Sequence, residues 1–524
     1  MKFSSIKEDK LFLTLIIIIV ILGIYIRLVD FSVTGYWNDD MTTIPTAVLW
    51  FYPHDYYPGL AGQGEPALGN LIIGSFCMLS GEDFSGVSKI QPMFYPGREE
   101  LIGEAMTNAE SYCKSSMYVF GIIFFIIIFV LSISLLPKYS ALFSISSFAF
   151  FPRILQYSRL IHVDVIAYTF IASGLLFLWL AYKEEENPKK ELMFFILSFV
   201  FFGLSFATKL PNAVYLLLGL FIIIKKYKKE FLSLTKNLLK LNLNIDETNI
   251  NKKKFYKISI YSIISFIIAF FAPLNFNPKN LFLILQKYNI VNPERTCISI
   301  NTDVFSDISY FLFNLNVIGF LTLVFSLYIL YKLFRIKKEK NEEFILYLFI
   351  FFLFVISLSK AVNYPRVFIM YSFGVIFLMS LIFSQKEYLL FKILKNKKLI
   401  ITILLLNIIL SFSIVLSAVP YFIVKNTVTC SLNKELCAGV DPNDLSPYSA
   451  KQAAEYLSTI LKDNETFLPQ SIILYYIRRD EGIPHYSFVE NVNKVAGRNP
   501  TLEEYVKYFH PNNRTVRYYL LNPN

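Results

Sequence analysis

Long apolar runs recur along this chain, and they leave few structures open to it. The first run, residues 11–29, reads LFLTLIIIIVILGIYIRLV and carries a single charge. About 20 apolar residues cross the ~30 Å hydrocarbon core of a bilayer as a helix. Hydrophobic residues make up 55% of the 524 residues and charged residues 17%, whereas soluble domains are nearer about 45–50% and about 25%. We therefore predict a polytopic α-helical membrane protein.

The runs that approach this length predict about eleven transmembrane helices. The third run is short, and the fifth and sixth are separated only by the turn around Lys209 and Pro211. The predicted spans cover residues 11–29, 115–136, 139–152, 165–182, 192–208, 211–225, 256–274, 309–331, 344–359, 364–384 and 399–421.

Basic residues gather in three connectors that fall on one side of an eleven-span topology. Segment 225–257 holds ten lysines against three acids, 332–343 holds five basic residues against three acids, and 385–398 holds five lysines against one acid. Positive charge marks the cytoplasmic side of a membrane protein, so the N-terminus is predicted to be cytoplasmic. The net charge of +11 then reflects topology, and we expect no nucleic-acid partner.

The first run can be a retained anchor or a cleaved signal peptide. It has no obvious small-residue cleavage site, and Arg27 and Asp30 stand where small residues would be expected. The anchor is therefore favoured, which predicts a multi-pass protein of the cell membrane. The Lys-, Ile- and Asn-rich composition fits an AT-rich prokaryotic genome, archaeal or bacterial.

Two segments are predicted on the outer side. The connector 30–114 holds eleven acids against three bases, and loops of such length are usually functional. Within it, PALGNLIIGSFCMLSG (66–81) is apolar but too short to span comfortably, which predicts an interfacial or re-entrant helix. Beyond the transmembrane domain, 1–424, the tail 425–524 predicts a small extracytoplasmic α/β domain, with a helix over 446–464 and strands over 468–477 and 515–523.

The five cysteines are too few for a disulfide framework. Cys77, Cys113 and Cys297 fall in or near outer loops. Cys430 and Cys437 are close enough in the tail to bridge a small loop if that side is oxidising. Whether they do so is left open. None of the five stands in a metal-binding spacing.

Two adjacent carboxylates, Asp39 and Asp40, follow the first span in the stretch GYWNDDM. Asp is common at the start of a helix, so a capping role is one interpretation. The other is a general base or a metal ligand at the membrane surface. Because paired carboxylates suit a hard divalent cation, Asp39 and Asp40 are the candidate ligands if a metal is used.

Other charged residues are predicted on the same outer side. FPRILQYSRLIHVD places Arg159, His162 and Asp164 at the mouth of a helix, where an acid is costly unless it is paired or functional. Lys209 and Arg366 are predicted in two further outer turns, although basic residues are usually enriched on the cytoplasmic side of a membrane protein. Helix capping and snorkelling to lipid headgroups explain each residue singly. Together, the basic side chains suit a phosphate.

These motifs together resemble the class C glycosyltransferases of the protein O-mannosyltransferase and aminoarabinose-transferase superfamily. Asp39-Asp40 is similar to the family's Asp-Glu pair, and GEPALGNLIIGSFCMLSG to its His-Pro-Pro-Leu…Phe-Gly segment, with Glu65 in place of His or Lys. SRLIHVD resembles the Ser-Arg…Asp of the second loop, GLSFATK the Gly-Leu-Ala…Thr-Lys motif, and NYPRVFIMY the Arg-Tyr stretch. The likeness runs in order from about residue 11 to 424.

The resemblance implies an inverting transfer of a sugar, a hexose with mannose as the candidate, from a polyprenyl or dolichyl phosphate to an acceptor hydroxyl. Asp39, with Asp40 beside it, would be the base. Lys209, Arg366 and Arg159 would bind the donor phosphate, and Asp164, His162 and Glu65 would organise the site or the acceptor. The acceptor can be a protein, a glycan or a lipid, and the family implies no metal requirement.

Two other functions are consistent with the same residues. A transporter or flippase of lipid-linked sugars would bind phosphate with the same basic groups, but it predicts polar residues at mid-membrane depth. A non-enzymatic receptor would use 30–114 and the tail to bind a partner, and it would leave Asp39, Lys209 and Arg366 far apart.

Overall fold

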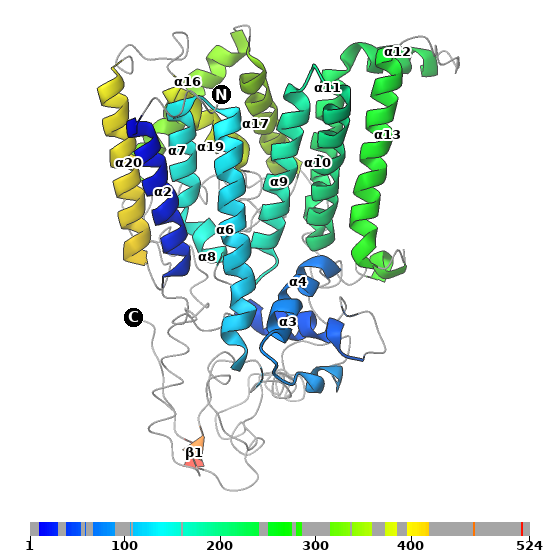
Figure 1. Cartoon of the computed structure of the whole chain (residues 1–524), viewed down its shortest axis with the longest axis vertical. Coiled ribbons are helices and arrows are strands. Elements are labelled where there is room, and N and C mark those ends of the chain that lie inside the picture. Colours follow the sequence, from blue (N-terminus) through cyan, green and yellow to red (C-terminus); the bar gives the residue numbers. More distant parts are fainter. Residues whose placement is uncertain are drawn as a thin grey trace, which may run out of the picture.

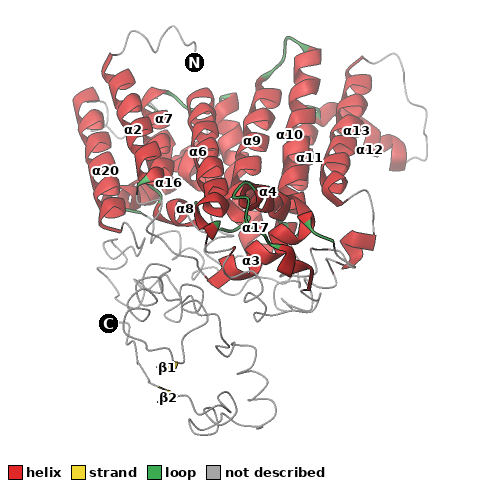
Figure 2. Ribbon diagram, turned by 60° about the horizontal axis from the view of Figure 1, so that its bottom comes forward, coloured by secondary structure: helices red, strands yellow, loops and turns green. Residues whose placement is uncertain are grey.

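The protein is a bundle of long helices with a smaller group of helices at one end (Figures 1 and 2). This arrangement comes from a computed structural model. It describes residues 10–29, 38–53, 58, 66–89, 105, 108–158, 161–239, 250–274, 279–283, 285, 315–335, 338–358, 372–384, 396–418, 465–466 and 515–516.

Each predicted span overlaps a helix of the bundle. Six helices are long and apolar enough to cross a membrane, and they confirm a multi-pass membrane protein. These six are α2 (Lys10–Leu28), α6 (Glu110–Leu135), α9 (Asp164–Lys183), α10 (Pro188–Thr208), α13 (Ile250–Phe271) and α16 (Val317–Arg335). The other overlapping helices are α7 (Lys138–Ala149), α11 (Val214–Lys226), α17 (Lys340–Leu358), α19 (Phe373–Ser380) with η9 (Leu381–Phe383), and α20 (Lys397–Ala418). The count of eleven crossings stays a prediction.

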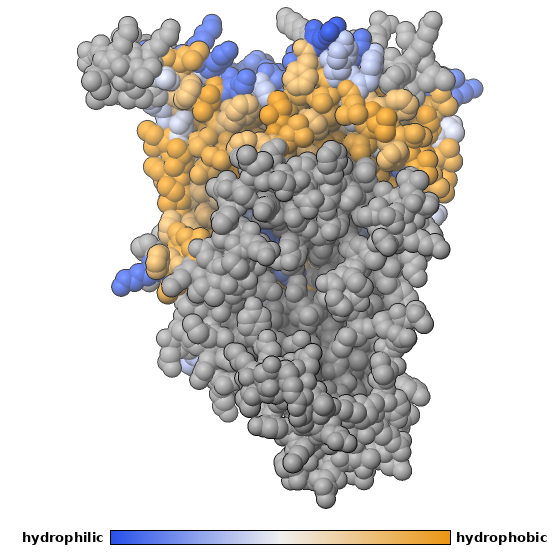
Figure 3. Space-filling model, turned by 180° about the vertical axis from the view of Figure 1, so that it is seen from behind, coloured by the Kyte–Doolittle hydropathy of each residue, from blue (hydrophilic) through white to orange (hydrophobic). Residues whose placement is uncertain are grey.

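The outer surface of the bundle is apolar around its described middle. Large aliphatic side chains are exposed there, among them Ile21, Ile126, Ile268 and Leu327. Figure 3 shows this apolar band on one face, with hydrophilic residues gathered at one end of it. Because a soluble protein rarely exposes so large an apolar surface, the band is the surface that contacts lipid.

Helix α9 lies at the centre of the bundle, with 78% of its apolar window buried. It packs against α6 on one side and α10 on the other. Thr169 Oγ donates to the Phe120 carbonyl of α6 (3.0 Å), and Ser198 Oγ of α10 donates to the Gly174 carbonyl of α9 (2.9 Å). Small residues and hydroxyls of this kind let membrane helices approach closely. α9 is therefore held rigidly between its neighbours.

Described parts of two basic connectors lie against the end of α9 and the turn that follows it. Lys340, the first residue of α17, pairs with Glu185 in the turn between α9 and α10, and Lys226 of α11 donates to the Ala181 carbonyl (2.6 Å). A helix not foreseen from the sequence, α12 (Lys228–Leu239), begins in the basic segment 225–257. Parts of two basic connectors are thus placed at the same end of the bundle, while the cytoplasmic location of the connectors stays a prediction.

A buried carboxylate connects the three helices α10, α11 and α13 at this same end. Glu191, in the first turn of α10, is fully buried. Its Oε1 lies 2.8 Å from Lys226 Nζ of α11 and accepts from the Tyr227 hydroxyl (2.7 Å). Its Oε2 lies 2.5 Å from Lys254 Nζ of α13. Glu191 therefore offsets part of the positive charge of two lysines, whose burial at the membrane boundary would otherwise be unfavourable.

The opposite end carries the helices of the long first connector, α3 (Asn38–Val48) and α4 (Ala67–Met78), followed by the 3₁₀ turn η3 (Ser85–Lys89) (Figure 1). The prediction of a short apolar helix within 66–81 is confirmed as α4. Ala67 packs in an apolar cluster with Ala207 and Leu210 at the end of α10 and Phe270 of α13. Helix α4 therefore covers the ends of two bundle helices.

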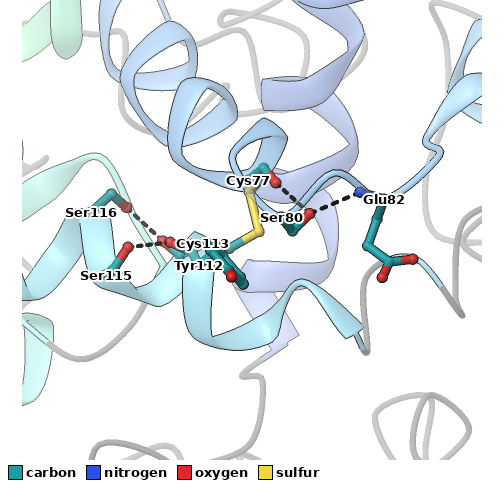
Figure 4. Close-up of a disulfide and its surroundings, with 7 residues drawn as sticks. All are labelled: Cys77, Ser80, Glu82, Tyr112, Cys113, Ser115 and Ser116. Atoms are coloured by element: carbon teal, nitrogen blue, oxygen red, sulfur yellow. Dashed lines mark hydrogen bonds between the residues drawn. A yellow bond between two sulfur atoms is a disulfide. The ribbon is translucent and has the colours of Figure 1, made fainter.

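A disulfide joins α4 to α6, between Cys77 and Cys113 (Figure 4). This pairing was not predicted from the sequence, where only Cys430 and Cys437 were considered as partners; those two residues lie outside the described part of the chain. The bond forms because α4 folds back across 36 residues of sequence onto the first turn of α6. A structural disulfide indicates an oxidising compartment, which agrees with an outward-facing first connector.

In the tail, two short strands pair in parallel, β1 (Glu465–Thr466) with β2 (Thr515–Val516). β2 begins at the start of the predicted strand 515–523, whereas β1 precedes the predicted strand 468–477. All other residues of 425–524 lie outside the described part of the chain. The small α/β domain therefore stays a prediction.

Candidate active site

Two charged residues meet where α9 begins and α10 ends, on the side of α3 and α4. Asp164 is the first residue of α9, and Lys209 is the C-cap of α10. An acid is favoured at a helix N-terminus and a base at a C-terminus, because the helix dipole carries partial charges of the opposite sign there. Since α9 and α10 run antiparallel, both favourable positions fall at the same end of the bundle.

The two residues form an ion pair in the protein interior. Lys209 Nζ donates to Asp164 Oδ1. The Asp164 side chain is fully buried, and that of Lys209 is 12% exposed. A lone charge at this depth would be strongly unfavourable, whereas a hydrogen-bonded pair largely compensates the loss of water. The remaining exposure of Lys209 leaves its ammonium accessible from one direction.

His162 contacts the second oxygen of the same carboxylate. Its Nδ1 lies 2.8 Å from Asp164 Oδ2, and its side chain is 4% exposed. Each of the two carboxylate oxygens therefore contacts a different basic side chain. Such a carboxylate holds the imidazole in one orientation. The structure thus brings together three of the residues predicted to act at the site.

The turn that follows Lys209 is held by an amide. The 3₁₀ turn η5 (Leu210–Ala213) begins directly after Lys209. Asn212 Nδ2 donates to Ser205 Oγ of α10 (2.8 Å), and its backbone N–H donates to the Lys209 carbonyl (3.1 Å). These bonds fix the backbone on both sides of Lys209. The position of the ammonium is consequently set before any ligand binds.

Helix α4 lies directly against the segments that carry the pair. A Cβ placed on Gly69 would lie 2.5 Å from Val163 Cγ1 and 3.0 Å from Thr208 Cγ2, and these two residues immediately precede Asp164 and Lys209. A side chain larger than that of glycine would push α4 away from them. Gly69 therefore allows the first connector to close over the site.

The remaining predicted site residues are described in part or not at all. Asp39 and Asp40 are the second and third residues of α3, which packs on α4, so their backbone lies on the same side of the bundle as Lys209. Their side chains lie outside the described residues, as do Glu65, Arg159 and Arg366. Within the described part of the chain, no group of three or more His, Cys, Asp or Glu could hold a metal ion.

Arg27 has a structural role that was not predicted from the sequence. This residue lies in the last turn of α2 and is 1% exposed. Its Nη1 donates to the Gly23 carbonyl (2.7 Å) and to the Ala149 carbonyl at the end of α7 (3.2 Å), and its guanidinium lies 4.7 Å from the ring centre of Phe125. A cation at a helix C-terminus is favourable. Arg27 therefore joins α2 to α7 and α6.

A second missed residue is Asn70, the one amide in the apolar run of α4. It is 1% exposed, and its Oδ1 accepts no hydrogen bond from the described residues. The available signal was a polar residue inside an otherwise apolar helix, one position after Gly69. In the structure this amide is buried, on the helix that lies against the site.

Comparison with known proteins supports the fold and the family. Residues 114–243 match the family described as dolichyl-phosphate-mannose-protein mannosyltransferase. This match includes Asp164, His162 and Lys209. Comparison with curated sequences finds no significant match.

Two solved structures share the fold over almost the whole chain. The apo form of ArnT from Cupriavidus metallidurans superposes with a TM-score of 0.50 at 10% identity, covering 94% of this chain and 90% of that one. The form of the same protein bound to undecaprenyl phosphate gives 0.51 at 11% identity, with the same coverage of 94% and 90%. The resemblance predicted from the sequence is thus confirmed at the level of a partial match and a fold: residues 114–243 match the dolichyl-phosphate-mannose-protein mannosyltransferase family, and the protein shares the fold of ArnT.

Proposed function

We propose that this protein is a membrane glycosyltransferase that moves a sugar from a polyprenyl-phosphate donor to an acceptor hydroxyl on the extracytoplasmic side. The observation that carries this proposal is the buried pair of Lys209 and Asp164, with His162 beside it, beneath α4 at one end of the bundle. A fixed ammonium at the membrane boundary suits the phosphate of a lipid whose chain lies among the helices.

The proposed reaction is a direct displacement at the anomeric carbon of the sugar. The Asp39 carboxylate takes the proton of the acceptor hydroxyl, and the acceptor oxygen attacks the anomeric carbon. The bond from that carbon to the phosphate oxygen breaks with inversion, and the lipid phosphate leaves with the electron pair. Lys209 stabilises the charge that develops on the phosphate, together with Arg366 and Arg159. Asp164 and His162 hold the ammonium in place.

Several observations support the donor and the side of the membrane. The matched family is described by its dolichyl-phosphate-mannose donor, and a structure of the same fold binds undecaprenyl phosphate. Mannose is accordingly the proposed sugar. The disulfide between Cys77 and Cys113 supports an outward-facing first connector. The acceptor would be a protein, a glycan or a lipid that reaches this side.

The other two functions receive less support. A transporter needs charged groups along its path, yet the ion pairs of Asp164 and Glu191 lie at opposite ends of the bundle. A receptor would separate the predicted residues, yet α3, which contains Asp39 in its first turn, packs on the helix that covers Lys209.

The proposal is tested with purified protein in nanodiscs, radiolabelled polyprenyl-phosphate sugars and a membrane extract as acceptor. The wild type should transfer label, and Asp39→Asn should lose transfer while eluting as a folded monodisperse species. Normal transfer by Asp39→Asn would reject its role as base. Donor binding without transfer to any acceptor would favour the transporter.

A further inference from the structure

We propose that Asn70 is a binding residue for a hydroxyl group of the donor sugar. This inference rests on the proposed function and names a contact within the same site. It begins from a buried polar group without a partner: Asn70 is 1% exposed, and its Oδ1 accepts no hydrogen bond within the described structure. Burying such an oxygen without a hydrogen bond is unfavourable. Buried polar groups in proteins are usually hydrogen-bonded to the protein itself, to water or to a ligand.

The position of Asn70 on α4 turns it inward. Residues four and seven positions apart share a helix face, so Gly74 and Cys77 lie on the same face as Asn70. A Cβ on Gly74 would lie 2.2 Å from the Ala47 carbonyl oxygen of α3, and Cys77 is bonded to Cys113 of α6. This face of α4 therefore looks toward α3 and α6, and away from the lipid.

The residue before Asn70 packs against the segments that carry the ion pair. Gly69 packs against Val163 and Thr208, each one residue from a member of the pair of Asp164 and Lys209. Asn70 thus lies where α3, α4 and the ends of α9 and α10 meet. A donor whose phosphate contacts Lys209 would place its sugar, one bond away, in this region.

The hydrogen-bonding groups of the Asn70 side chain indicate which kind of ligand group it binds. A carboxamide is neutral and offers one acceptor oxygen and two donor hydrogens. It matches a sugar hydroxyl, which both donates and accepts, better than a phosphate, which suits Lys or Arg. The disulfide between Cys77 and Cys113, two turns along the helix, keeps this face in place.

The test compares a lipid phosphate with and without a sugar. Full-length protein in nanodiscs is titrated with decaprenyl phosphate and with decaprenyl phosphates that carry mannose, glucose or galactose. The variants are Asn70→Leu, which keeps the volume without hydrogen bonds, and Asn70→Ala, in case leucine does not fit. The matched control is Ser75→Ala, because Ser75 is exposed on the same helix and donates only to the Leu71 carbonyl (2.7 Å).

The wild type should bind one sugar-bearing lipid more tightly than bare decaprenyl phosphate. Asn70→Leu and Asn70→Ala should bind that lipid about tenfold more weakly, as expected for one lost hydrogen bond, and should bind the bare lipid as the wild type does. Ser75→Ala should behave as the wild type with both lipids. A variant that merely loosens α4 would lose affinity for both.

Three outcomes would overturn the proposal, and they are distinguishable. If the Asn70 variants keep the wild-type preference for the sugar-bearing lipid, or lose affinity for both lipids equally, Asn70 does not bind the sugar. If the wild type shows no preference for a sugar-bearing lipid, no sugar contact exists at this site. If the wild type binds neither lipid, the proposed function itself fails.

Discussion

The ammonium of Lys209 donates to the buried carboxylate of Asp164 across the ends of two antiparallel helices. The two residues are 45 positions apart in the sequence, and each occupies the helix end where the dipole favours its charge. His162 contacts the other oxygen of the same carboxylate. The pair thus holds the Lys209 ammonium in a preformed, largely dehydrated position with limited access. In the proposed reaction this ammonium contacts the donor phosphate.

Asp164→Asn should lower stability strongly, because it leaves the buried Lys209 without its counter-charge. Removing one partner of a buried pair typically costs about 3–5 kcal/mol. The double variant Asp164→Asn/Lys209→Met should recover much of that loss. Thermal unfolding of the purified proteins in detergent, followed by tryptophan fluorescence, measures both effects. A double variant that is less stable than Asp164→Asn would contradict the mutual compensation.

Cys77→Ser should also destabilise the protein, through the loss of the bond from α4 to α6. Closing a loop with a sequence separation of 36 restricts the unfolded chain, which the chain-entropy relation values at about 4 kcal/mol. The melting temperature should fall for Cys77→Ser and for the wild type in reductant. Ser80→Ala, three residues along the chain, is the control. A linked peptide containing Cys77 and Cys113 should appear in a non-reducing digest, and its absence would reject the bond.

Glu191→Gln should lower stability without changing transfer by the folded protein. The substitution leaves Lys226 and Lys254 without the carboxylate that they share, at a cost of about 3 kcal/mol. The site is unaffected because Glu191 lies roughly 27 Å along α10 from Lys209, at about 1.5 Å per residue. Glu185→Gln, at an exposed carboxylate paired with Lys340, is the control. A changed KM for the donor in Glu191→Gln would show that the two ends are coupled.

Composition and apolar length were enough to predict the helical bundle, but not where its helices begin. Helix α10 starts four residues before the predicted 192, because Asn187 caps it through its side chain and Pro188 occupies the first position. Helix α6 starts at Glu110 rather than 115, where Glu110 pairs with Lys114 one turn later (2.5 Å). A polar first turn has no hydropathy signal, although its capping residues can be read from the sequence.

The sequence singled out Lys209 and Asp164 as candidate residues, but it did not predict their contact. Lys209 stood out because it runs against the charge bias of outer loops, and Asp164 because an acid is costly at a membrane boundary. Their pairing depends on the antiparallel packing of α9 and α10. The disulfide of Cys77 likewise depends on how α4 folds back, and spacing alone does not determine such connectivity. Asn70 was visible in the sequence only as a polar residue in a largely apolar helix, and its burial was needed to single it out.

The most direct measurement is the single-turnover rate of sugar transfer from decaprenyl-phosphate-mannose by Lys209→Met in nanodiscs. The account predicts a rate about 100-fold or more below the wild type per folded molecule, because a fixed charge is lost where negative charge develops. Lys209→Arg should retain part of the rate. Lys340→Met, at the opposite end of the bundle, should transfer as the wild type does. A Lys209→Met variant that transfers mannose at the wild-type rate would contradict the central claim that Lys209 stabilises the departing phosphate.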